Sequence, residues 1–212
     1  MSTIAPTRPT SPDPPGSRRI TVDEYERIIR SGAIRDPDRL ELVDGYMVDK
    51  MGKSAEHGFS TRKLLDRLGP MIGPGWTWRS EQPVRIPAYD EPEPDITIVR
   101  GSTDDYAHRI PGPDDVGLLI EISLTTLGTD RGLKLSAYAR DGIPVYWIVD
   151  LVDRRIEVYT RPLKAGRYRS RKEFLPGQQV PVVIDGRPIG HVAVDDILPP
   201  EPAAAMARGN GT

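Results

Sequence analysis

Two short apolar runs, separated by an amphipathic stretch, form the clearest pattern along the chain. Residues 117–123 and 145–149 are almost continuously apolar, which is typical of buried strands, and the residues between them, from about 130 to 141, have a helical pattern. A strand, a helix and a second strand in this order form two parallel strands joined by a right-handed crossover. We therefore expect the C-terminal end of the first strand to lie beside the first turn of the helix.

The rest of the pattern predicts further strands and two earlier helices. Thr21 and Glu24 have the spacing of a capping box at the start of a short helix, and a second helix is expected from about residue 54 to 68. Asp44-Gly45, between two short apolar segments, is a strong hairpin signal. The other expected strands are residues 76–79, 84–86, 95–99, 155–160, 168–174 and 180–184, with a meander as one arrangement of the last two. Together these elements predict a mixed α/β fold.

Three charged residues are brought to one rim of the sheet by this arrangement. Glu121 stands near the end of the first apolar strand, and Lys134 stands in the first turns of the helix, so the crossover makes them neighbours. Asp95 opens the strand at 95–99, and if that strand runs antiparallel to 118–123, its start meets the other strand's end. Two carboxylates and a lysine at one rim suggest magnesium-dependent phosphodiester chemistry.

Each of these residues also has a simpler explanation. Because Asp95 follows several prolines, the simpler explanation is that it is an aspartate in a turn. Glu121 lies in an apolar run, where an ionised carboxylate is costly unless it is paired or holds a metal, and an arginine partner is the simpler alternative. Lys134 would form an ordinary surface pair with Asp130, four residues earlier on the helix. The local sequence leaves these alternatives open.

Several groups of residues occur in a characteristic order. They are Leu40-Glu41-Leu42-Val43-Asp44-Gly45, Glu56-His57-Gly58, Pro94-Asp95, Glu121-Ile122-Ser123, Asp130 with Lys134, and the run from Tyr138-Ala139-Arg140-Asp141-Gly142 to Ile148-Val149-Asp150. This order resembles the Uma-type family of putative restriction endonucleases, in the PD-(D/E)XK nuclease superfamily, over roughly residues 20 to 198. The resemblance implies a restriction-endonuclease-like fold, with a mixed central sheet flanked by helices.

The resemblance also implies roles for the three rim residues. Asp95 and Glu121 would be metal ligands, and Lys134 would be the catalytic lysine. The superfamily pattern normally has a lysine two residues after the glutamate, where this chain has Ser123. The resemblance implies that Lys134, from the following helix, takes its place.

Further residues are candidates for accessory roles. Glu41 is a candidate third metal ligand or a solvent-facing strand residue, and His57 could orient a phosphate or a water, or only cap its helix. Tyr138 lies one helical turn beyond Lys134, near the expected cleft, or belongs to the core. A basic stripe at period two is suited to phosphates, although a charged edge strand that resists aggregation has the same pattern. The stripe consists of Arg167, Arg169 and Arg171, with Lys172 adjacent.

Composition sets bounds on these interpretations. The 212 residues fit one domain, expected at 20–198 between disordered tails at 1–19 and 199–212. The absence of cysteine excludes disulfides, thiolate metal sites and cysteine nucleophiles. No apolar segment approaches the length of a membrane span, so we expect a cytoplasmic protein. A net charge of −2 and a pI near 6.0 lack the strongly basic character of a dedicated nucleic-acid binder, so any attraction to nucleic acid must be local.

These observations lead to one hypothesis and two alternatives. The hypothesis is an endonuclease that uses Mg²⁺, with Mn²⁺ as a substitute, to hydrolyse nucleic acid, most plausibly DNA. A homodimer would suit the cutting of both strands of a duplex. One alternative is a catalytically inactive nuclease fold that binds nucleic acid or protein. The other is a hydrolase such as a glycosidase, in which two carboxyl groups flank the bond that is cleaved.

Overall fold

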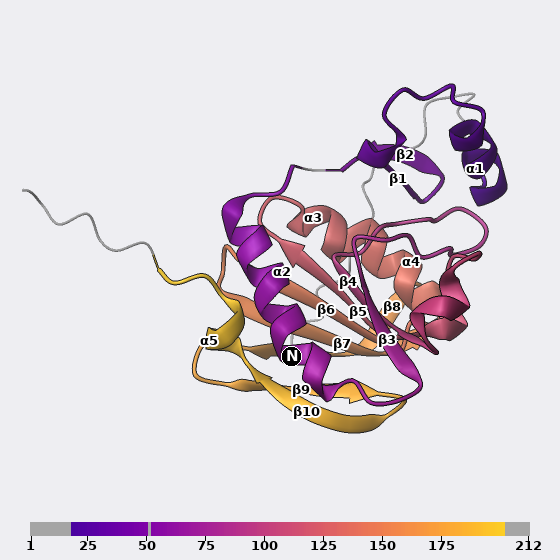
Figure 1. The fold of residues 1–212 in the computed structure, drawn as a ribbon. Coiled ribbons are helices and arrows are strands. Elements are labelled where there is room, and N and C mark those ends of the chain that lie inside the picture. The colour runs from indigo at the N-terminus through magenta and orange to yellow at the C-terminus, as the bar shows by residue number, and fades with distance from the viewer. Residues whose placement is uncertain (1–17, 51, 202–212) are drawn as a thin grey trace, which may run out of the picture.

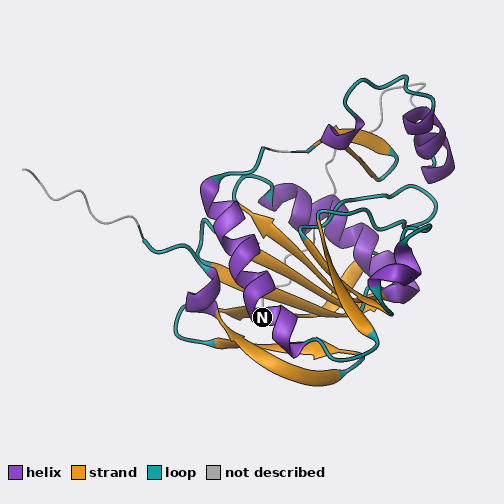
Figure 2. Ribbon diagram, in the orientation of Figure 1, coloured by secondary structure: helices purple, strands orange, loops and turns teal. Residues whose placement is uncertain are grey.

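A six-stranded mixed sheet lies at the centre of the computed structural model, which describes residues 18–50 and 52–201 (Figures 1 and 2). The helices are α1 (Val22–Arg30), α2 (Ala55–Leu68), α3 (Leu127–Thr129), α4 (Leu135–Arg140) and α5 (Val194–Ile197). The strands are β1 (Leu40–Val43), β2 (Tyr46–Asp49), β3 (Trp76–Ser80), β4 (Ile96–Arg100), β5 (Val116–Ser123), β6 (Val145–Asp150), β7 (Arg155–Leu163), β8 (Arg167–Phe174), β9 (Gln179–Ile184) and β10 (Arg187–Ala193). The mixed α/β prediction is confirmed. Most of the two predicted disordered tails lies outside the described residues.

The central sheet has the strand order β3-β4-β5-β6-β7-β8. Strands β5 and β6 are parallel, and every other neighbouring pair in this sheet is antiparallel. The predicted strand–helix–strand unit is therefore confirmed. The predicted antiparallel pairing of β4 with β5 is also confirmed, and in it Ile96 lies opposite Ile120. This pairing brings the start of β4 to the C-terminal end of β5.

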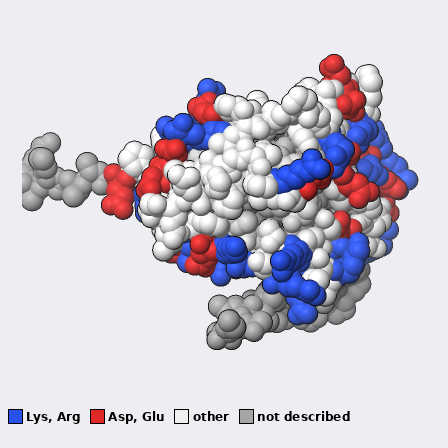
Figure 3. All heavy atoms as spheres, turned by 90° about the horizontal axis from the view of Figure 1, so that it is seen from below, with Lys and Arg blue, Asp and Glu red and all other residues white. Residues whose placement is uncertain are grey.

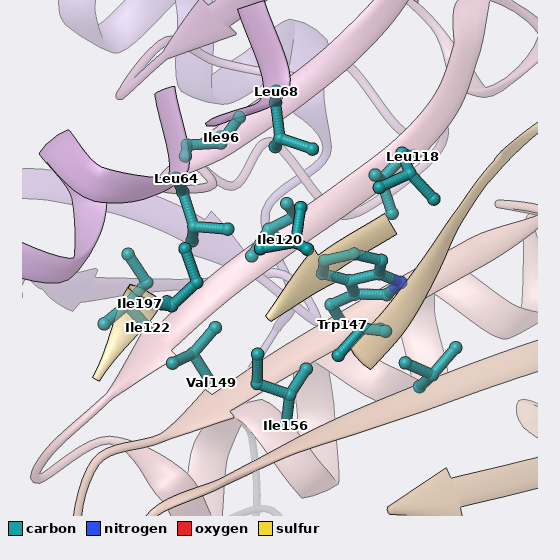
Figure 4. Close-up of a cluster of buried hydrophobic side chains, with 14 of the residues drawn as sticks. Leu64, Leu68, Ile96, Leu118, Ile120, Ile122, Trp147, Val149, Ile156 and Ile197 are labelled. Carbon is teal, nitrogen blue, oxygen red and sulfur yellow. The ribbon is translucent and has the colours of Figure 1, made fainter. Parts of the chain in front are cut away.

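The two faces of the sheet are covered differently. Helix α2, the β9–β10 hairpin and α5 cover one face, where Leu64 and Leu68 pack against Ile120 and Trp147 (Figures 1 and 4). The crossover helix covers the opposite face, where Tyr138 packs with Tyr146. Because both faces are covered, β5 and β6 are buried along their whole length, which explains their continuous apolar runs.

The crossover helix between β5 and β6 contains a π-helical turn. Its residues run from α3 through a π-helical segment, Asp130–Lys134, into α4. The backbone N–H of Leu135 donates to the carbonyl of Asp130, five residues back, and the hydroxyl of Tyr146 donates to the same carbonyl at 3.1 Å. Single π-turns of this kind are often found at functional sites.

A small N-terminal unit, made of α1 and the β1–β2 hairpin, packs against the body of the protein (Figure 1). The predicted hairpin turn is confirmed, with positive φ at both Asp44 and Gly45 (50° and 79°), and so is the capping box of Thr21 and Glu24. Asp90 joins this unit to the body. Its carboxylate accepts from the backbone N–H of Asp44 at 2.5 Å and from Arg140 of α4 at 2.7 Å.

Two predictions about strands were wrong. Residues 84–86 form no strand, because prolines flank the segment and its N–H groups bond to loops: Val84 donates to the carbonyl of Pro92 and Ile86 to that of Asp90. Strands β8 and β9 form no meander. β8 pairs with β7, and β9 pairs with β10, which the sequence analysis missed. β10 contains Pro188 and Gly190, both unfavourable for a strand pattern.

Within residues 18–50 and 52–201, no helix has both the length and the apolar character needed to cross a membrane.

Candidate active site

A polar cavity of about 240 Å³ opens where the C-terminal end of β5, the start of β4 and the crossover helix meet. Strand β1 and the N-terminal turn of α2 complete its wall. It is lined by Glu41, Lys50, Gly52, Lys53, Ser54, His57, Glu81, Glu93, Asp95, Glu121, Ile122, Leu124, Thr125, Thr126, Asp130 and Lys134. The three predicted rim residues, together with Glu41, His57 and Asp130, therefore converge on one cavity.

Glu121 lies at the floor of this cavity. It is 4% exposed, and its Oε1 accepts hydrogen bonds from Lys134 at 3.1 Å and from the hydroxyl of Tyr138 at 2.8 Å. Burial raises the pKa of Glu121 well above its usual range; Lys134 acts to lower it, whereas Asp130 and Asp95 raise it further. Lys134 is thus the group that favours the ionised form of this carboxylate, against burial and the neighbouring carboxylates.

Lys134 bridges two carboxylates that come from distant parts of the chain. Its Nζ lies 3.0 Å from Glu41 of β1 and 3.1 Å from Glu121 of β5. Burial acts to lower the pKa of Lys134, but Glu121 and Glu41 outweigh it and hold the pKa above its ordinary value. The lysine is therefore charged. Only 7% of Lys134 is exposed, so it does not form the ordinary surface pair with Asp130 that was the simpler explanation.

Ser123, at the position where the superfamily pattern has lysine, takes part in the site in another way. Its hydroxyl donates to Asp130 at 2.6 Å, and the hydroxyl of Thr126 donates to the same carboxylate oxygen at 2.6 Å. Burial raises the pKa of Asp130, while Lys134 and these two hydroxyls act to lower it. The two hydroxyls fix Asp130 at the start of the π-turn, and the turn then carries Lys134 to Glu121.

Asp95 is held from two sides at the edge of the cavity. Its Oδ2 accepts from the backbone N–H of Ile122 at 2.7 Å, and its Oδ1 lies 3.0 Å from Nε2 of His57. His57 is near the start of α2, where Ser54 caps the helix by accepting from the N–H of His57. The hydroxyl of Thr61 lies 3.5 Å from Nδ1 of His57, so the ring is held between Thr61 and Asp95.

The balance of charge in the cavity favours a divalent cation. Four buried carboxylates face the cavity, namely those of Glu41, Asp95, Glu121 and Asp130, and among the residues that the structure describes Lys134 is the one buried cation beside them. No three His, Asp or Glu side chains of the described residues are already arranged around a common metal position. Mg²⁺ does not need such an arrangement, because it keeps several waters and is commonly bound by one or two carboxylates. The donor set therefore fits a hard cation.

Other predicted residues lie elsewhere or have additional roles. Tyr138 is both a core residue, fully buried against Tyr146, and a partner of Glu121. Arg171, from the predicted basic stripe, pairs at 2.8 Å with Glu157, a buried residue of β7 outside the cavity.

The remaining stripe residues, Arg167, Arg169 and Lys172, are exposed on β8. None of the stripe residues lines the site cavity. On the face of the molecule shown in Figure 3, Lys and Arg form several separate groups around a broad uncharged area.

Sequence analysis missed two residues that shape the cavity. The backbone N–H of Glu93 donates to Glu41 at 3.1 Å, and the carboxylate of Glu93 lies 2.5 Å from Nζ of Lys50. The alternation Glu91-Pro92-Glu93-Pro94-Asp95 was the available signal, since residues two apart on an extended segment face the same side.

Comparisons with known proteins identify the family and agree with the fold. The family model described as "Uma2: Putative restriction endonuclease" matches residues 22–186. Among solved structures, the chain is similar to the crystal structure of a putative nuclease of the DUF820 family from Anabaena variabilis, with 17% sequence identity and a TM-score of 0.61. That similarity covers 84% of this chain and 97% of the other, and at this identity it bears on the fold alone. No curated protein sequence matches the chain.

Proposed function

The chain belongs to the Uma2 family of putative restriction endonucleases, and from this premise we propose that it is a Mg²⁺-dependent endonuclease that hydrolyses phosphodiester bonds of DNA. Family membership supports a nuclease function. The Mg²⁺ ion and the DNA substrate go beyond family membership and are part of our proposal. Mn²⁺ is expected to substitute for Mg²⁺, because both ions are suited to carboxylate and water ligands.

The observation that carries the proposal is the buried contact between Glu121 and Lys134 at the floor of a polar cavity. A buried salt bridge that served only stability would gain nothing from further carboxylates around it. Here Glu41, Asp95 and Asp130 add negative charge that Lys134 alone does not balance. A divalent cation would supply the missing charge.

The carboxylates of Asp95 and Glu121 would hold Mg²⁺, helped by Glu41 and by the carbonyl of Ile122. When bound, the ion supplies a water of lowered pKa and positive charge opposite the phosphate. Lys134 would orient that water or would neutralise charge that develops on the scissile phosphate.

Other side chains of the site hold these groups in place. Tyr138 fixes one oxygen of Glu121, and both hydrogen bonds described for this carboxylate end on that oxygen, which leaves Oε2 for a ligand. His57 and the backbone N–H of Ile122 hold Asp95, one at each carboxylate oxygen.

The test compares metal binding and DNA nicking in the same samples. We expect wild-type protein to bind Mg²⁺ in titration calorimetry and to nick supercoiled plasmid. Asp95→Asn and Glu121→Gln are expected to lower nicking at least about a hundredfold. Asp185→Asn is the control, because Asp185 is a surface carboxylate in the β9–β10 turn that pairs with Arg100. Full magnesium-dependent nicking by both site variants would contradict the proposal.

The second candidate function is a nuclease fold that binds nucleic acid without cleaving it. It is favoured by the serine at position 123 and by the net charge of −2. Fluorescence anisotropy with labelled duplex DNA separates the two candidates. DNA binding by wild-type protein, with no nicking in Mg²⁺ or Mn²⁺, would favour the binding protein over the enzyme.

Two further properties complete the proposal. We also propose a cytoplasmic location, which cell fractionation would test. A homodimer would place two active sites on the two strands of a duplex, and sedimentation velocity would measure it directly.

A further inference from the structure

The two strands that end the central sheet differ in charge. Strand β8 ends the sheet on one side, and most of its residues are charged: Arg167, Arg169, Arg171, Lys172 and Glu173. Strand β3 ends it on the other side, and Arg79 is the one charged residue within it (Figure 1). Charged side chains on an edge strand hinder its pairing with another chain. The β3 edge lacks this protection.

Hydrogen bonds just beyond the two ends of β3 show how its backbone is oriented. The N–H of Gly101 donates to the carbonyl of Gly75 at 2.7 Å, and the N–H of Glu81 donates to the carbonyl of Asp95 at 3.2 Å. Both pairs continue the register of β3 against β4. Hydrogen-bonded pairs alternate with non-bonded pairs along an antiparallel ladder, so the odd-numbered residues of β3 are the ones that bond to β4.

The even-numbered residues of β3 therefore point their backbone groups away from the sheet. They are Trp76, Trp78 and Ser80, and within the described part of the chain no loop forms a backbone hydrogen bond with their N–H or C=O groups. The side chain of Trp78 adds apolar surface to this edge, because the residue is 45% exposed. A row of free donors and acceptors beside an exposed aromatic residue is suited to the addition of another strand.

A cavity of about 480 Å³ adjoins the start of β3. Its lining includes Pro74 and Trp76 together with Ile184 and Ile189 of the β9–β10 hairpin. The indole of Trp76 is held in place, because the guanidinium of Arg100 lies over its ring at 4.6 Å from the centroid. Trp76 and Trp78 are two residues apart on one strand, so their side chains project from the same face of the sheet. The apolar lining of the cavity and the exposed indole are thus on the same face.

A second copy of the chain matches this edge by symmetry. Two identical strands that pair antiparallel are related by a two-fold axis, and an axis at Thr77 places Trp76 of each copy opposite Trp78 of the other. Both tryptophans are outward-pointing residues, so each such pair can exchange its two backbone hydrogen bonds. Opposed residues share a face, so Trp78 of the partner subunit lies beside Trp76 and diagonal to Pro74, which both line the cavity.

Pairing of β3 with β8 of another copy fits less well. It would bring the charged side chains of β8 against the apolar lining formed by Trp76, Ile184 and Ile189. It would also be a head-to-tail contact, which leaves a free edge on each added copy and does not close as a dimer. Pairing of β3 with β3 uses the weakly charged edge of both copies and leaves the two protected β8 edges outside.

We propose that the chain forms a two-fold homodimer through β3, with Thr77 at the axis and Trp78 of each copy against the cavity beside Trp76 of the other. The inference rests on the homodimer of the proposed function and names its surface. Glu81, at the C-terminal end of β3, bonds to Asp95 of the candidate active site. The C-terminal ends of antiparallel strands point in opposite directions, so the two active sites lie on either side of the axis.

The first test measures association in EDTA, without metal and therefore without cleavage. We expect full-length wild-type protein to sediment as a dimer at micromolar concentration. Trp78→Lys places a charge against the apolar cavity and is expected to raise the dissociation constant of the dimer about tenfold or more. Val152→Ser is the matched control, because it removes an apolar side chain that is 61% exposed in the β6–β7 turn, and it is expected to dimerise like wild type. Far-UV circular dichroism checks that each variant is folded.

The second test keeps Trp78 and reads the register. The chain contains no cysteine, so an introduced cysteine is its only thiol. At the axis, the two Thr77 residues form a non-hydrogen-bonded pair with Cα atoms about 4.5 Å apart, within the disulfide range of about 4.4–6.8 Å. We expect Thr77→Cys to form a covalent dimer on mild oxidation. Lys172→Cys, an exposed position on β8, is the control and is expected to form none.

Each result bears on a different part of the proposal. A monomeric wild-type protein would overturn the homodimer, and a dimer that Trp78→Lys leaves intact would overturn β3 as its surface. A dimer in which Thr77→Cys forms no disulfide would overturn the register. Plasmid nicking enters neither measurement, so failure of the nuclease proposal and failure of this interface are distinguishable.

Discussion

Tyr138 shows how one residue can serve the core and the candidate site together. Its ring packs edge-on against Tyr146 at 5.0 Å between centroids, and its hydroxyl donates to Glu121. Burial, followed by the charge of Glu121, raises the pKa of Tyr138 well above its usual range, so the hydroxyl stays protonated and remains a donor.

We expect Tyr138→Phe to lower the free energy of unfolding by about 1.5–3 kcal/mol, because it removes a buried hydrogen bond to a charged acceptor. Urea unfolding at pH 7 measures this. Tyr89→Phe is the control, since Tyr89 is 38% exposed, and it is expected to change stability by less than about 0.5 kcal/mol. Equal stability of Tyr138→Phe and wild type would show that the hydrogen bond contributes nothing.

The meeting of Glu121, Lys134 and Asp95 could be predicted from sequence because it depends on topology alone. A crossover connection places strand end and helix start together whatever the side chains are. The outward-pointing backbone groups of β3 could not be predicted in this way. They depend on the register of β3 against β4, and because a long loop, residues 81–95, joins these strands, no tight turn sets that register.

At the scale of elements, β7 and the crossover helix are joined by an ion cluster on the same side of the sheet as Lys134. Glu157 of β7 is fully buried, and Arg131 of the π-turn, together with Arg171 of β8, donates to its carboxylate. Burial acts to raise the pKa of Glu157, but these arginines and Tyr159 outweigh it and lower the pKa to about 2. The cluster thus ties the π-turn to the sheet.

A prediction for pH dependence follows from Glu157. Its folded pKa lies below its ordinary value of 4.5, so its contribution to stability is present above pH 4.5 and is lost as the pH falls toward 2. We expect Glu157→Gln to be less stable than wild type at pH 7, by about 2–3 kcal/mol, with a difference that shrinks below pH 4.5. Unfolding curves between pH 2.5 and 7 measure the difference, and a constant gap across this range would be the contrary result.

Among the strands predicted correctly, β5 and β6 are buried on both faces and β9 alternates clearly. The errors occurred where backbone partners, and not side-chain burial, decide the structure. Val84 and Ile86 are fully buried without belonging to a strand, and β10 forms because the turn at Asp185 and Gly186, both with positive φ, folds it back onto β9. A hydrophobic pattern reports burial and does not report which backbone groups pair.

At the scale of the whole molecule, Asp90 connects the N-terminal unit to the body. Burial raises the pKa of Asp90 to about 6, although the N–H of Asp44 and the charge of Arg140 act to lower it. The folded pKa is above the ordinary value of 3.8, so the folded protein binds the proton more tightly than the unfolded chain does. The contribution of this group to stability is greatest below pH 3.8 and falls as the pH rises through 6.

We expect wild-type protein to gain stability relative to Asp90→Asn as the pH falls from about 6.5 to 4, by up to about 3 kcal/mol. Thermal unfolding of both proteins across this range measures the relative change. Asp185→Asn, a surface carboxylate that pairs with Arg100 far from Asp90 in the sequence, is the control and is expected to follow wild type. A difference between wild type and Asp90→Asn that does not vary with pH would contradict the assignment.

Strands β5 and β6, the one parallel pair among the described strands, have a consequence for the order in which the molecule is assembled. Hairpins such as β1–β2 and β7–β8 can form as soon as their own residues are available, whereas β5 and β6 can pair only after the crossover helix has folded between them. The hydroxyl of Tyr146 in β6 donates to the carbonyl of Asp130, so the turn that carries Lys134 to Glu121 is fully supported only when β6 has joined the sheet. During translation, the chain is expected to remain unable to cut nucleic acid until roughly its first 150 residues have left the ribosome.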